Sequence, residues 1–464
     1  MLLGAWRPAA ESADPRLREL ARAIRGPVFA PSSAAYAQAR QPFNTRYESV
    51  RPLAVVQPVD VRDVQQIVRW ARKRGVRLAA RSGGHSYAGY STTTGVLVDL
   101  SRLNAIRLSG GIATVGAGAR MIDLYQALAR RGVTVPAGSC PTVGLGGLAL
   151  GGGVGLASRR FGTTSDNVAS LGIVTADGRF RTCSAKQNSD LFWGCRGGGG
   201  GNFGIVTAFG LRVHRVSNVS WYAASWPWSQ AEEVVRAWQG FAPGAPDRLF
   251  SLCSLGKGTR AGIQSFGQFF GSEQELRTLL RPLTSVAGTS LSTGTSSYYE
   301  AQLRWAGCLR ESPAACRVPR RSAFAAKSDY ANEPLSAGGV ATVLRWIDRV
   351  SGFRFGSLLL DAYGGAINRV RPDATAFVHR DALFSMQYLA YWGEGSAAAV
   401  QWIRGFHAAM RPHVSGFAYQ NYIDPDLTTW KHAYYGANYA RLTNVKRAYD
   451  PDFFFRFRQA IPPS

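Results

Sequence analysis

The pattern of apolar positions between residues 53 and 100 predicts one parallel strand–helix–strand unit. LAVVQP at 53–58 is a continuous apolar run stopped by proline, as in a buried strand. Apolar residues then recur at helical spacing over 60–75, which begins with an aspartate suited to the N-cap and ends with a glycine. VRLAA at 76–80 and GVLVDL at 95–100 predict two further strands. The loop between them therefore lies at the carboxyl end of a strand, where open α/β sheets bind ligands.

A second unit of the same kind is predicted over 113–138, from ATVGAG, a helix with Met121 and Leu124 on its apolar face, and GVTVPAG. LGIVTADGRFRTCS at 171–184 predicts a hairpin with Asp177 and Gly178 in its turn, because Asp-Gly suits a two-residue connection. FGIVTAFGLRVHRV at 203–216 predicts another strand.

The chain changes character after residue 216. Alternating strands mix with helices near 229–241, 272–283 and 337–350, which favours an antiparallel sheet with helices on one side. We therefore expect an α+β protein with a domain over 1–217 and a second domain over 218–417. The final segment, 418–464, is too short to fold alone and must dock on an earlier part of the chain.

Charge and targeting features narrow the possible partners. Lys and Arg number 54 against 29 Asp and Glu, a net charge of +25 that attracts anionic partners. The basic clusters at 72–75 and 317–321 are short and lack zinc-finger or RNA-binding patterns, so we expect no nucleic-acid partner. Met1–Trp6 is too short for a signal-peptide core, and no apolar run spans a bilayer, so we expect no membrane partner. A processed chain looks the same, so the compartment stays open.

The chain has six cysteines, none with a CxxC metal spacing, and we expect no metal site. Cys308 and Cys316 can pair if the protein is exported, but we expect two separate thiols.

Glycine is abundant, with 52 residues, and it is concentrated at 138–155 and 194–204. GLGGLA at 144–149 matches the dinucleotide-binding pattern G-x-G-x-x-A. That pattern must follow a strand directly and open a helix, but Pro136 and Pro141 interrupt the approach and four later glycines disfavour a helix. We therefore expect extended backbone lying close to a ligand.

Two reactive side chains stand beside these glycines. RSGGHSYAG at 81–89 carries a lone imidazole, His85, and AGSCPTVG at 137–144 carries a lone thiol, Cys140. A lone histidine or cysteine is usually structural, but the two together form a pattern.

This pattern resembles the berberine bridge enzyme-like flavin enzymes, within the group whose FAD domain is of the vanillyl-alcohol oxidase or p-cresol methylhydroxylase (PCMH) type. The segments that carry the resemblance are RSGGHSYAGYS at 81–91, AGSCPTVGLGGLALGGGVGLASRRFGTTSDNV at 137–168, SDLFWGCRGGGGGNFGIVT at 189–207, YQNYIDPDL at 419–427 and YYGANYARLTNVKRAYDPDFFFRF at 434–457. The resemblance implies a two-part PCMH-type FAD-binding domain, an antiparallel-sheet substrate domain and a C-terminal segment that returns to the FAD domain.

The resemblance also implies that FAD is bound covalently, through its 8α-methyl group to His85 and through ring carbon 6 to Cys140. Glycine neighbours permit such close approach of backbone to a ring. The other residues implied to contact the cofactor are Arg81, Ser82, Gly83, Gly84, Ser86, Val143, Gly144, Gly147, Gly152, Asp166, Asn167, Gly204, Ile205, Val206, Asn421, Tyr422, Tyr435, Asn438 and Arg441.

In the family, a substrate carbon gives a hydride to flavin N5 while a base takes a proton from oxygen. The resemblance points to Tyr419 as this base and to Gln387 as a further active-site residue. Asp361 and Tyr363, two apart on a strand, face one side, and either is suited to lower the pKa of Tyr419.

Val143 at the implied oxygen gate favours an oxidase that forms H2O2 from O2. The implied substrate is a small molecule with an alcohol or hemiacetal carbon: a sugar, an oligosaccharide or a glycosylated natural product. The alternatives are a dehydrogenase or ring-forming oxidase acting on a secondary metabolite and, from another class, a non-catalytic carbohydrate-binding protein.

Overall fold

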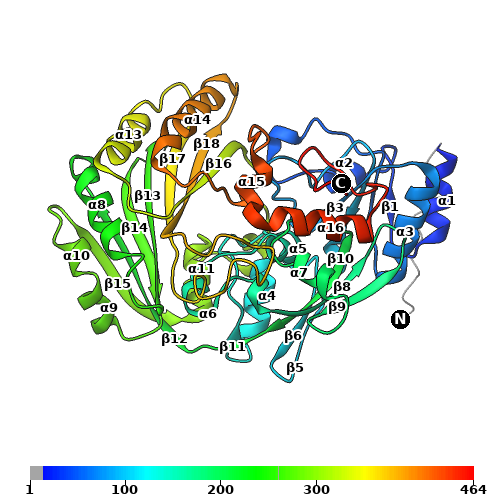
Figure 1. Ribbon diagram of the computed structural model, residues 1–464, viewed down its shortest axis with the longest axis horizontal. Helices are drawn as coiled ribbons and strands as arrows, with labels where there is room; N and C mark the ends of the chain where they lie inside the picture. Colours follow the sequence, from blue (N-terminus) through cyan, green and yellow to red (C-terminus); the bar gives the residue numbers. More distant parts are fainter. Residues whose placement is uncertain (1–13, 260, 464) are drawn as a thin grey trace.

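The predicted parallel unit is present at the start of the first of two lobes, which lie side by side in the computed structural model (Figure 1). The structure describes residues 14–259 and 261–463, so the apolar start Met1–Trp6 lies outside it. Strands β2 (Ala54–Val56) and β3 (Leu78–Arg81) both pair in parallel with β4 (Val96–Asp99), and helix α3 (Val61–Arg74) connects β2 to β3. Strand β1 (Val28–Phe29) completes the sheet as an antiparallel edge, and α1 (Pro15–Ala23) packs on α3.

The prediction of a second parallel strand–helix–strand unit over 113–138 is wrong. Strand β6 (Ile112–Gly116) belongs to a five-stranded antiparallel sheet of order β5-β6-β10-β8-β9 and pairs with β10 (Ile205–Arg212). Strand β7 (Val133–Thr134) pairs with β11 (His214–Arg215) instead. Apolar periodicity identifies a strand but not its partner, and both partners come about 80 to 95 residues later. The other strands are β5 (Ile106–Ser109), β8 (Val168–Val174) and β9 (Phe180–Ser184), and the helices of this lobe are α2 (Tyr36–Ala39), α4 (Met121–Ala129), α5 (Leu145–Leu150), α6 (Ser158–Phe161) and α7 (Ser189–Gly194).

The hairpin prediction is confirmed. Strands β8 and β9 pair antiparallel, and Gly178 in their turn has a φ of 72°. The carboxylate of Asp177 accepts hydrogen bonds from the Thr175 hydroxyl at 2.7 Å and the Arg179 amide at 3.1 Å.

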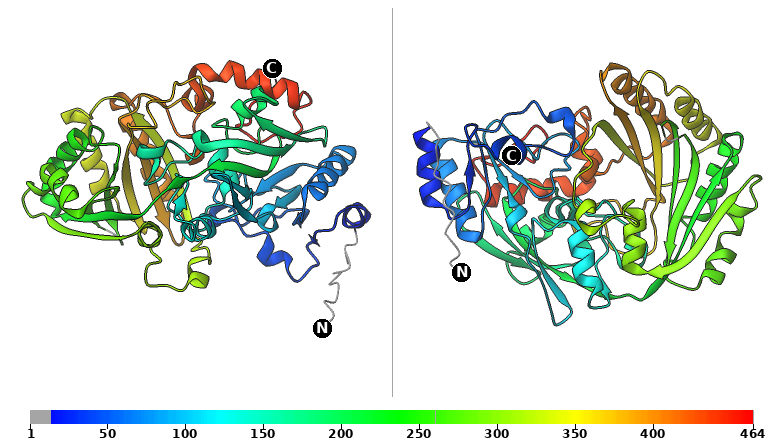
Figure 2. Two further views of the ribbon diagram at one scale, coloured as in Figure 1. Left: turned by 90° about the horizontal axis from the view of Figure 1, so that it is seen from below. Right: turned by 180° about the vertical axis from the view of Figure 1, so that it is seen from behind.

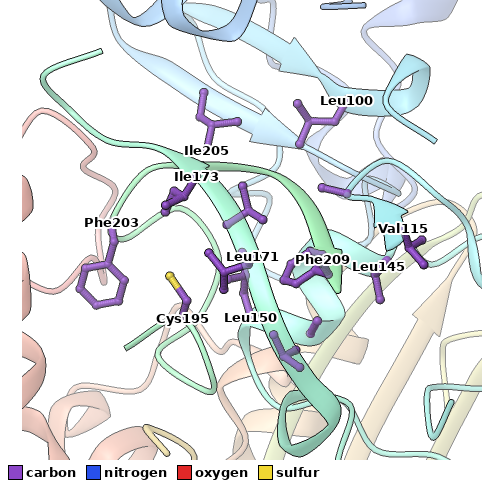
Figure 3. Packing of buried hydrophobic residues seen from close by; sticks show 14 of the residues in the cluster. Leu100, Val115, Leu145, Leu150, Leu171, Ile173, Cys195, Phe203, Ile205 and Phe209 are labelled. Atoms are coloured by element: carbon purple, nitrogen blue, oxygen red, sulfur yellow. The ribbon is translucent and has the colours of Figure 1, made fainter. Parts of the chain in front are cut away.

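The prediction of extended backbone after Gly144 is wrong for residues 145–150, which form helix α5. Its Leu145 and Leu150 are buried, and they pack with Leu171 of β8 and Phe209 of β10 (Figure 3). Burial of these leucines compensates for the low helix propensity of the glycines, and the helix ends at Gly151, where the glycine run begins.

The second lobe confirms the predicted antiparallel sheet with helices on one side (Figures 1 and 2). Its seven strands are in the order β15-β12-β14-β13-β17-β18-β16. They are β12 (Asn218–Trp226), β13 (Leu249–Gly258), β14 (Gly262–Phe269), β15 (Ser290–Ser297), β16 (Ala323–Ala331), β17 (Phe355–Ala362) and β18 (Phe384–Trp392). The outer helices are α8 (Ala231–Phe241), α9 (Glu273–Leu279), α10 (Arg281–Thr284), α13 (Ala337–Asp348) and α14 (Ala397–Met410). The domain limits at 217 and 417 stay a prediction.

Helix α11 (Tyr298–Trp305) contacts α4 of the first lobe, and the short helix α12 (Pro313–Cys316) follows it. The expectation of two separate thiols here is wrong, because Cys308 and Cys316 form a disulfide. The turn after α11 and the short helix α12 bring their Cα atoms to 5.7 Å, a distance that sequence spacing does not reveal.

The C-terminal segment, with α15 (Trp430–Tyr435) and α16 (Tyr439–Tyr449), lies on the first lobe (Figure 1). Its anchor is Lys446, whose fully buried ammonium group donates to the Asp450 carboxylate at 2.6 Å, the Phe455 carbonyl at 2.7 Å and the Asn202 carbonyl at 2.5 Å. Asn202 belongs to the first lobe, so this cation ties the two segments together. Across residues 14–259 and 261–463, no helix combines the length and apolar character that crossing a membrane requires.

Replacement of Lys446 by Met is expected to lower the free energy of unfolding by about 3–5 kcal/mol, because Asp450 stays buried without its cation. Urea titration followed by tryptophan fluorescence measures this. Exposed Lys431 supplies the matched control Lys431→Met, expected within about 0.5 kcal/mol of wild type. Equal losses in both variants would contradict the anchoring role.

Candidate active site

A cavity of about 690 Å³ contains most of the predicted site residues. The four-stranded and five-stranded sheets of the first lobe, the C-terminal segment and the region 306–324 of the second lobe line it. This volume lies within the range of roughly 300–1,000 Å³ that is typical of small-molecule sites. The predicted residues that line it are Ser82, Gly83, Gly84, His85, Ser86, Cys140, Val143, Gly144, Gly147, Gly204, Ile205, Val206, Asn421, Tyr422 and Tyr435.

The two loops that carry His85 and Cys140 touch backbone to backbone. A Cβ atom at Gly83 would lie 2.3 Å from the Gly144 nitrogen and 2.6 Å from the Thr142 carbonyl oxygen. The Ser82 hydroxyl donates to the Ala117 carbonyl at 2.5 Å and accepts from the Gly146 amide at 3.3 Å. Only glycine permits this contact, and the contact places both reactive side chains at the same cavity.

His85 presents a neutral imidazole. Its ring stacks on Phe43 with 3.7 Å between centroids, and its Nε2 lies 3.0 Å from the Thr142 hydroxyl. Burial, with a smaller effect of the Arg120 charge, lowers the pKa of His85 to about 3. The ring is therefore uncharged near neutral pH, and one of its nitrogens keeps a lone pair.

Cys140 is a free thiol that is accessible from the cavity. Surrounding protein atoms, and then the charge of Asp361, raise the pKa of this thiol.

The loop between β3 and β4 also offers unpaired amide groups. Within residues 14–259 and 261–463, the N–H groups of Gly83, Gly84 and His85 donate to no protein acceptor. Gly84 has a φ of 77°, so the amide direction turns here in a way that suits a concave anion site. These consecutive donors line the cavity and fit a phosphate-containing ligand.

Tyr419, predicted as the base, is buried with its hydroxyl oxygen held by two donors. The Gly153 amide donates to it at 2.8 Å and the Asn421 side-chain amide at 2.9 Å. Burial raises the pKa of Tyr419 to about 12, although both hydrogen bonds lower it and Asp361 raises it further. The groups that lower the pKa of Tyr419 are therefore Gly153 and Asn421.

Asp361 and Tyr363 differ in accessibility. Tyr363 is fully buried, and its hydroxyl forms a 3.1 Å hydrogen bond with that of Tyr330. Asp361, at the end of β17, is half-buried, and burial raises the pKa of its carboxyl group to about 7 despite a hydrogen bond with Ser385. Burial places the pKa of Tyr363 well above its usual range. Of the two, only Asp361 changes charge near neutral pH.

Gln387 of β18 reaches the site through Tyr87. The Gln387 amide donates to the Tyr87 hydroxyl at 2.7 Å, and the Tyr87 ring stacks on Tyr422 with 5.4 Å between centroids. Tyr87 and Tyr422 both line the cavity and form an aromatic surface there.

Several predicted cofactor residues lie outside the cavity lining. The Arg81 guanidinium donates to the backbone carbonyls of residues 39–41 and 91. Asp166 forms a 2.7 Å ion pair with buried Arg380. A Cβ at Gly152 would meet the Phe377 ring at 2.7 Å. Asn167 binds the backbone of residues 161 and 163, Asn438 binds that of residues 372 and 375, and Arg441 lies over the Trp193 ring.

Sequence reasoning missed Tyr87, Phe43 and Thr142 as site residues. Tyr87 lies two residues after His85, and Thr142 lies two residues after Cys140, so closeness to either was an available signal. No such signal existed for Phe43, because it lies 42 residues before His85 in the sequence and stacks on it only in the folded structure.

Comparison with known proteins agrees with this geometry. Residues 52–184 match a family model described as an FAD binding domain, and residues 418–462 match one described as berberine and berberine like. The uncharacterized FAD-linked oxidoreductase YgaK of Bacillus subtilis is 35% identical over 95% of this chain and 97% of its own length. Berberine bridge enzyme-like D-1 of Nicotiana tabacum is 32% identical over 89% of this chain and 83% of its own.

Solved structures show the same likeness. BBE-like 1 of Physcomitrella patens has a TM-score of 0.91 and 31% identity, covering 97% of this chain and all of its own. Two variants of Phl p 4 are each 29% identical and cover the same shares, with TM-scores of 0.89 and 0.88. The first is named a glucose dehydrogenase, and the second, which has an additional isoleucine-to-valine replacement, a glucose oxidase.

The fold and the cavity define an FAD-linked oxidoreductase with a PCMH-type FAD domain. The chain belongs to the berberine bridge enzyme-like family. The cavity fits the flavin nucleotide, because glycine backbone forms one wall, three free amide groups suit its pyrophosphate, and aromatic rings line the same space.

Replacement of Gly83 by Ala is expected to lower the FAD bound per protein at least tenfold, because the added methyl group meets three backbone atoms of residues 142–144 within 3 Å. The ratio of flavin to protein absorbance measures it. Gly240→Ala in α8 is the matched control, since its Cβ meets nothing within 4 Å and its flavin content is expected to stay unchanged. A normally loaded Gly83→Ala protein would rule out the glycine contact as a requirement.

Proposed function

We propose that this protein is an FAD-dependent oxidase that converts the alcohol or hemiacetal carbon of a sugar, oligosaccharide or glycosylated natural product to a carbonyl or lactone. The electrons pass to O2, which becomes H2O2. The observation that carries the proposal is that the Tyr419 hydroxyl accepts from the Gly153 amide of the glycine run and from Asn421, which lines the same cavity as Cys140. The sugar class is supported by the printed activities of the Phl p 4 variants.

Tyr419 binds and orients the substrate oxygen. Its hydroxyl oxygen already accepts from Gly153 and Asn421, so its proton points to a further acceptor. With a pKa of about 12, only about one Tyr419 in 10⁵ is ionised at pH 7. Tyr419 therefore needs a second group to take the proton that leaves the substrate.

Asp361 is this proton acceptor. Its pKa of about 7 leaves roughly half of the carboxyl groups ionised at neutral pH, which suits a general base. Tyr363, whose pKa lies well above its usual range, stays protonated and supports the site through Tyr330. The substrate hydroxyl proton thus passes through the Tyr419 hydroxyl to the Asp361 carboxylate.

FAD, when bound, supplies the acceptor for the hydride that leaves the same carbon. His85 and Cys140 hold it by two covalent bonds, one through nitrogen and one through sulfur. Support for this attachment comes from the glycine contact, which brings both side chains to one cavity. Two bonds exclude dissociation of the cofactor.

Val143 lines the cavity, and its short side chain would leave room for O2 beside a bound flavin. Between the two Phl p 4 variants, the one with an added valine in place of isoleucine is the one named an oxidase. The presence of the smaller valine at 143 supports oxidase over dehydrogenase activity.

A panel of reducing mono- and oligosaccharides tests the function. At least one is expected to bleach the flavin anaerobically, and mixing with air-saturated buffer is expected to restore the absorbance within seconds and release one H2O2 per flavin. Val143→Leu is expected to keep the bleaching and to slow the reoxidation at least tenfold. If the wild-type flavin stays reduced in air for minutes, the oxidase assignment is wrong. If no sugar of the panel bleaches the flavin, the assignment of a sugar substrate is wrong.

The pH dependence of kcat/KM tests the base. Activity is expected to rise through about pH 7 as the Asp361 carboxyl group loses its proton, since only the carboxylate accepts one. Asp361→Asn is expected to lower kcat by about 10²- to 10⁴-fold and to remove this rising limb. Tyr363→Phe is expected to keep the limb. If the rise of kcat/KM near pH 7 persists in Asp361→Asn, a residue other than Asp361 is the base.

A further inference from the structure

The ring of His85 is fixed by two contacts of different kinds. Stacking on Phe43, with 19° between the planes, sets the tilt of the imidazole. The 3.0 Å contact between Nε2 and the Thr142 hydroxyl sets its rotation within that plane. Stacking alone permits the ring to turn over and exchange its two nitrogens, so the hydroxyl contact decides which nitrogen faces the rest of the cavity.

The two nitrogens of His85 have different surroundings. Nε2 contacts the Thr142 hydroxyl, whereas Nδ1 forms no hydrogen bond with residues 14–259 or 261–463. A hydroxyl oxygen can accept from an Nε2–H group, and in that tautomer of the neutral ring Nδ1 holds the lone pair.

We propose that Thr142 is a positioning residue for covalent attachment of the flavin, which orients His85 by binding Nε2 and so presents Nδ1 as the nucleophile. This inference rests on the covalent attachment given under the proposed function.

Attachment of the flavin forms one C–N bond and breaks one C–H and one N–H bond. The Nδ1 lone pair forms the bond to the 8α carbon, the 8α C–H bond breaks with loss of its proton, and the Nε2 proton leaves past the Thr142 oxygen. Two electrons stay on the isoalloxazine ring, and O2, the oxidant of the proposed reaction, removes them as H2O2. Neutral His85 is needed for this, because a protonated imidazole has no free lone pair.

The Thr142 hydroxyl is not needed to hold its own loop in place. Backbone hydrogen bonds from the Ile122 amide to the Pro141 carbonyl and from the Met121 amide to the Val143 carbonyl, both 3.0 Å, fix this segment on α4. Among residues 14–259 and 261–463, the hydroxyl has no partner besides His85. Its removal therefore changes the orientation of His85 and leaves the cavity wall intact.

The experiment uses Cys140→Ala as the parent, so that His85 is its only anchor for the flavin. Thr142→Val removes the hydroxyl at nearly constant volume, Thr142→Ser keeps it, and Thr342→Val, at an equally buried threonine of α13, is the matched control. For each purified protein, total flavin is measured before acid precipitation. The acid-stable, covalently attached flavin is then measured in the precipitate. Mass spectrometry of the His85 peptide locates the link.

Thr142→Val is expected to keep its total flavin content within twofold of that of the parent. Its acid-stable fraction of flavin is expected to be at least tenfold lower than that of the parent. Thr142→Ser and Thr342→Val are expected to retain that fraction. If Thr142→Val protein is insoluble, Thr142→Ala serves the same comparison with the same expected loss.

An acid-stable fraction in Thr142→Val and Thr142→Ala equal to that of the parent overturns the role of Thr142 and leaves the proposed function standing. A parent without acid-stable flavin on His85 overturns the covalent attachment and the positioning role together. A loss of total flavin in Thr142→Val that Thr142→Ser shares equally also overturns the proposal, because the serine keeps the hydroxyl.

Discussion

The contact between Gly83 and Gly144 is the constraint on which the active site depends. It joins the loop after β3 to the segment before α5. Because neither residue has a side chain, backbone meets backbone, and the imidazole of His85 and the thiol of Cys140 open onto the same cavity. Ser82 strengthens the joint by bonding both to Ala117 and to Gly146. Glycine backbone in such a wall permits close approach of a ring system.

The glycine run that begins at Gly151 also contacts the C-terminal segment. At Gly151 a Cβ would lie 2.0 Å from the Asn421 side chain, so only glycine leaves room for it. The Gly153 amide donates directly to the Tyr419 hydroxyl. The buried ion pair of Lys446 and Asp450 keeps the segment in place on the first lobe. The site is therefore assembled from parts of the chain that are more than 250 residues apart.

Burial gives each ionisable group at the site a distinct charge state. It keeps His85 neutral, holds Tyr419 protonated and leaves the Asp361 carboxyl group poised near neutral pH. These differences separate the tasks of binding the cofactor, orienting the substrate oxygen and accepting a proton. The same residues in water would have ordinary pKa values and could not divide the work in this way.

The sequence by itself determined the parallel unit after residue 53, the hairpin at Asp177 and Gly178, the antiparallel sheet with helices on one side, and the glycine loops beside His85 and Cys140. These depend on local periodicity, turn chemistry and short motifs, which neighbouring residues carry. Only the tertiary structure decided that β6 pairs with β10, that residues 145–150 are helical, that Cys308 meets Cys316, and that Asp361 is more accessible than Tyr363. It also brought Phe43 and Thr142 to His85. Such outcomes depend on which distant surfaces pack together, and burial against a distant partner outweighs the weaker preferences of a short segment.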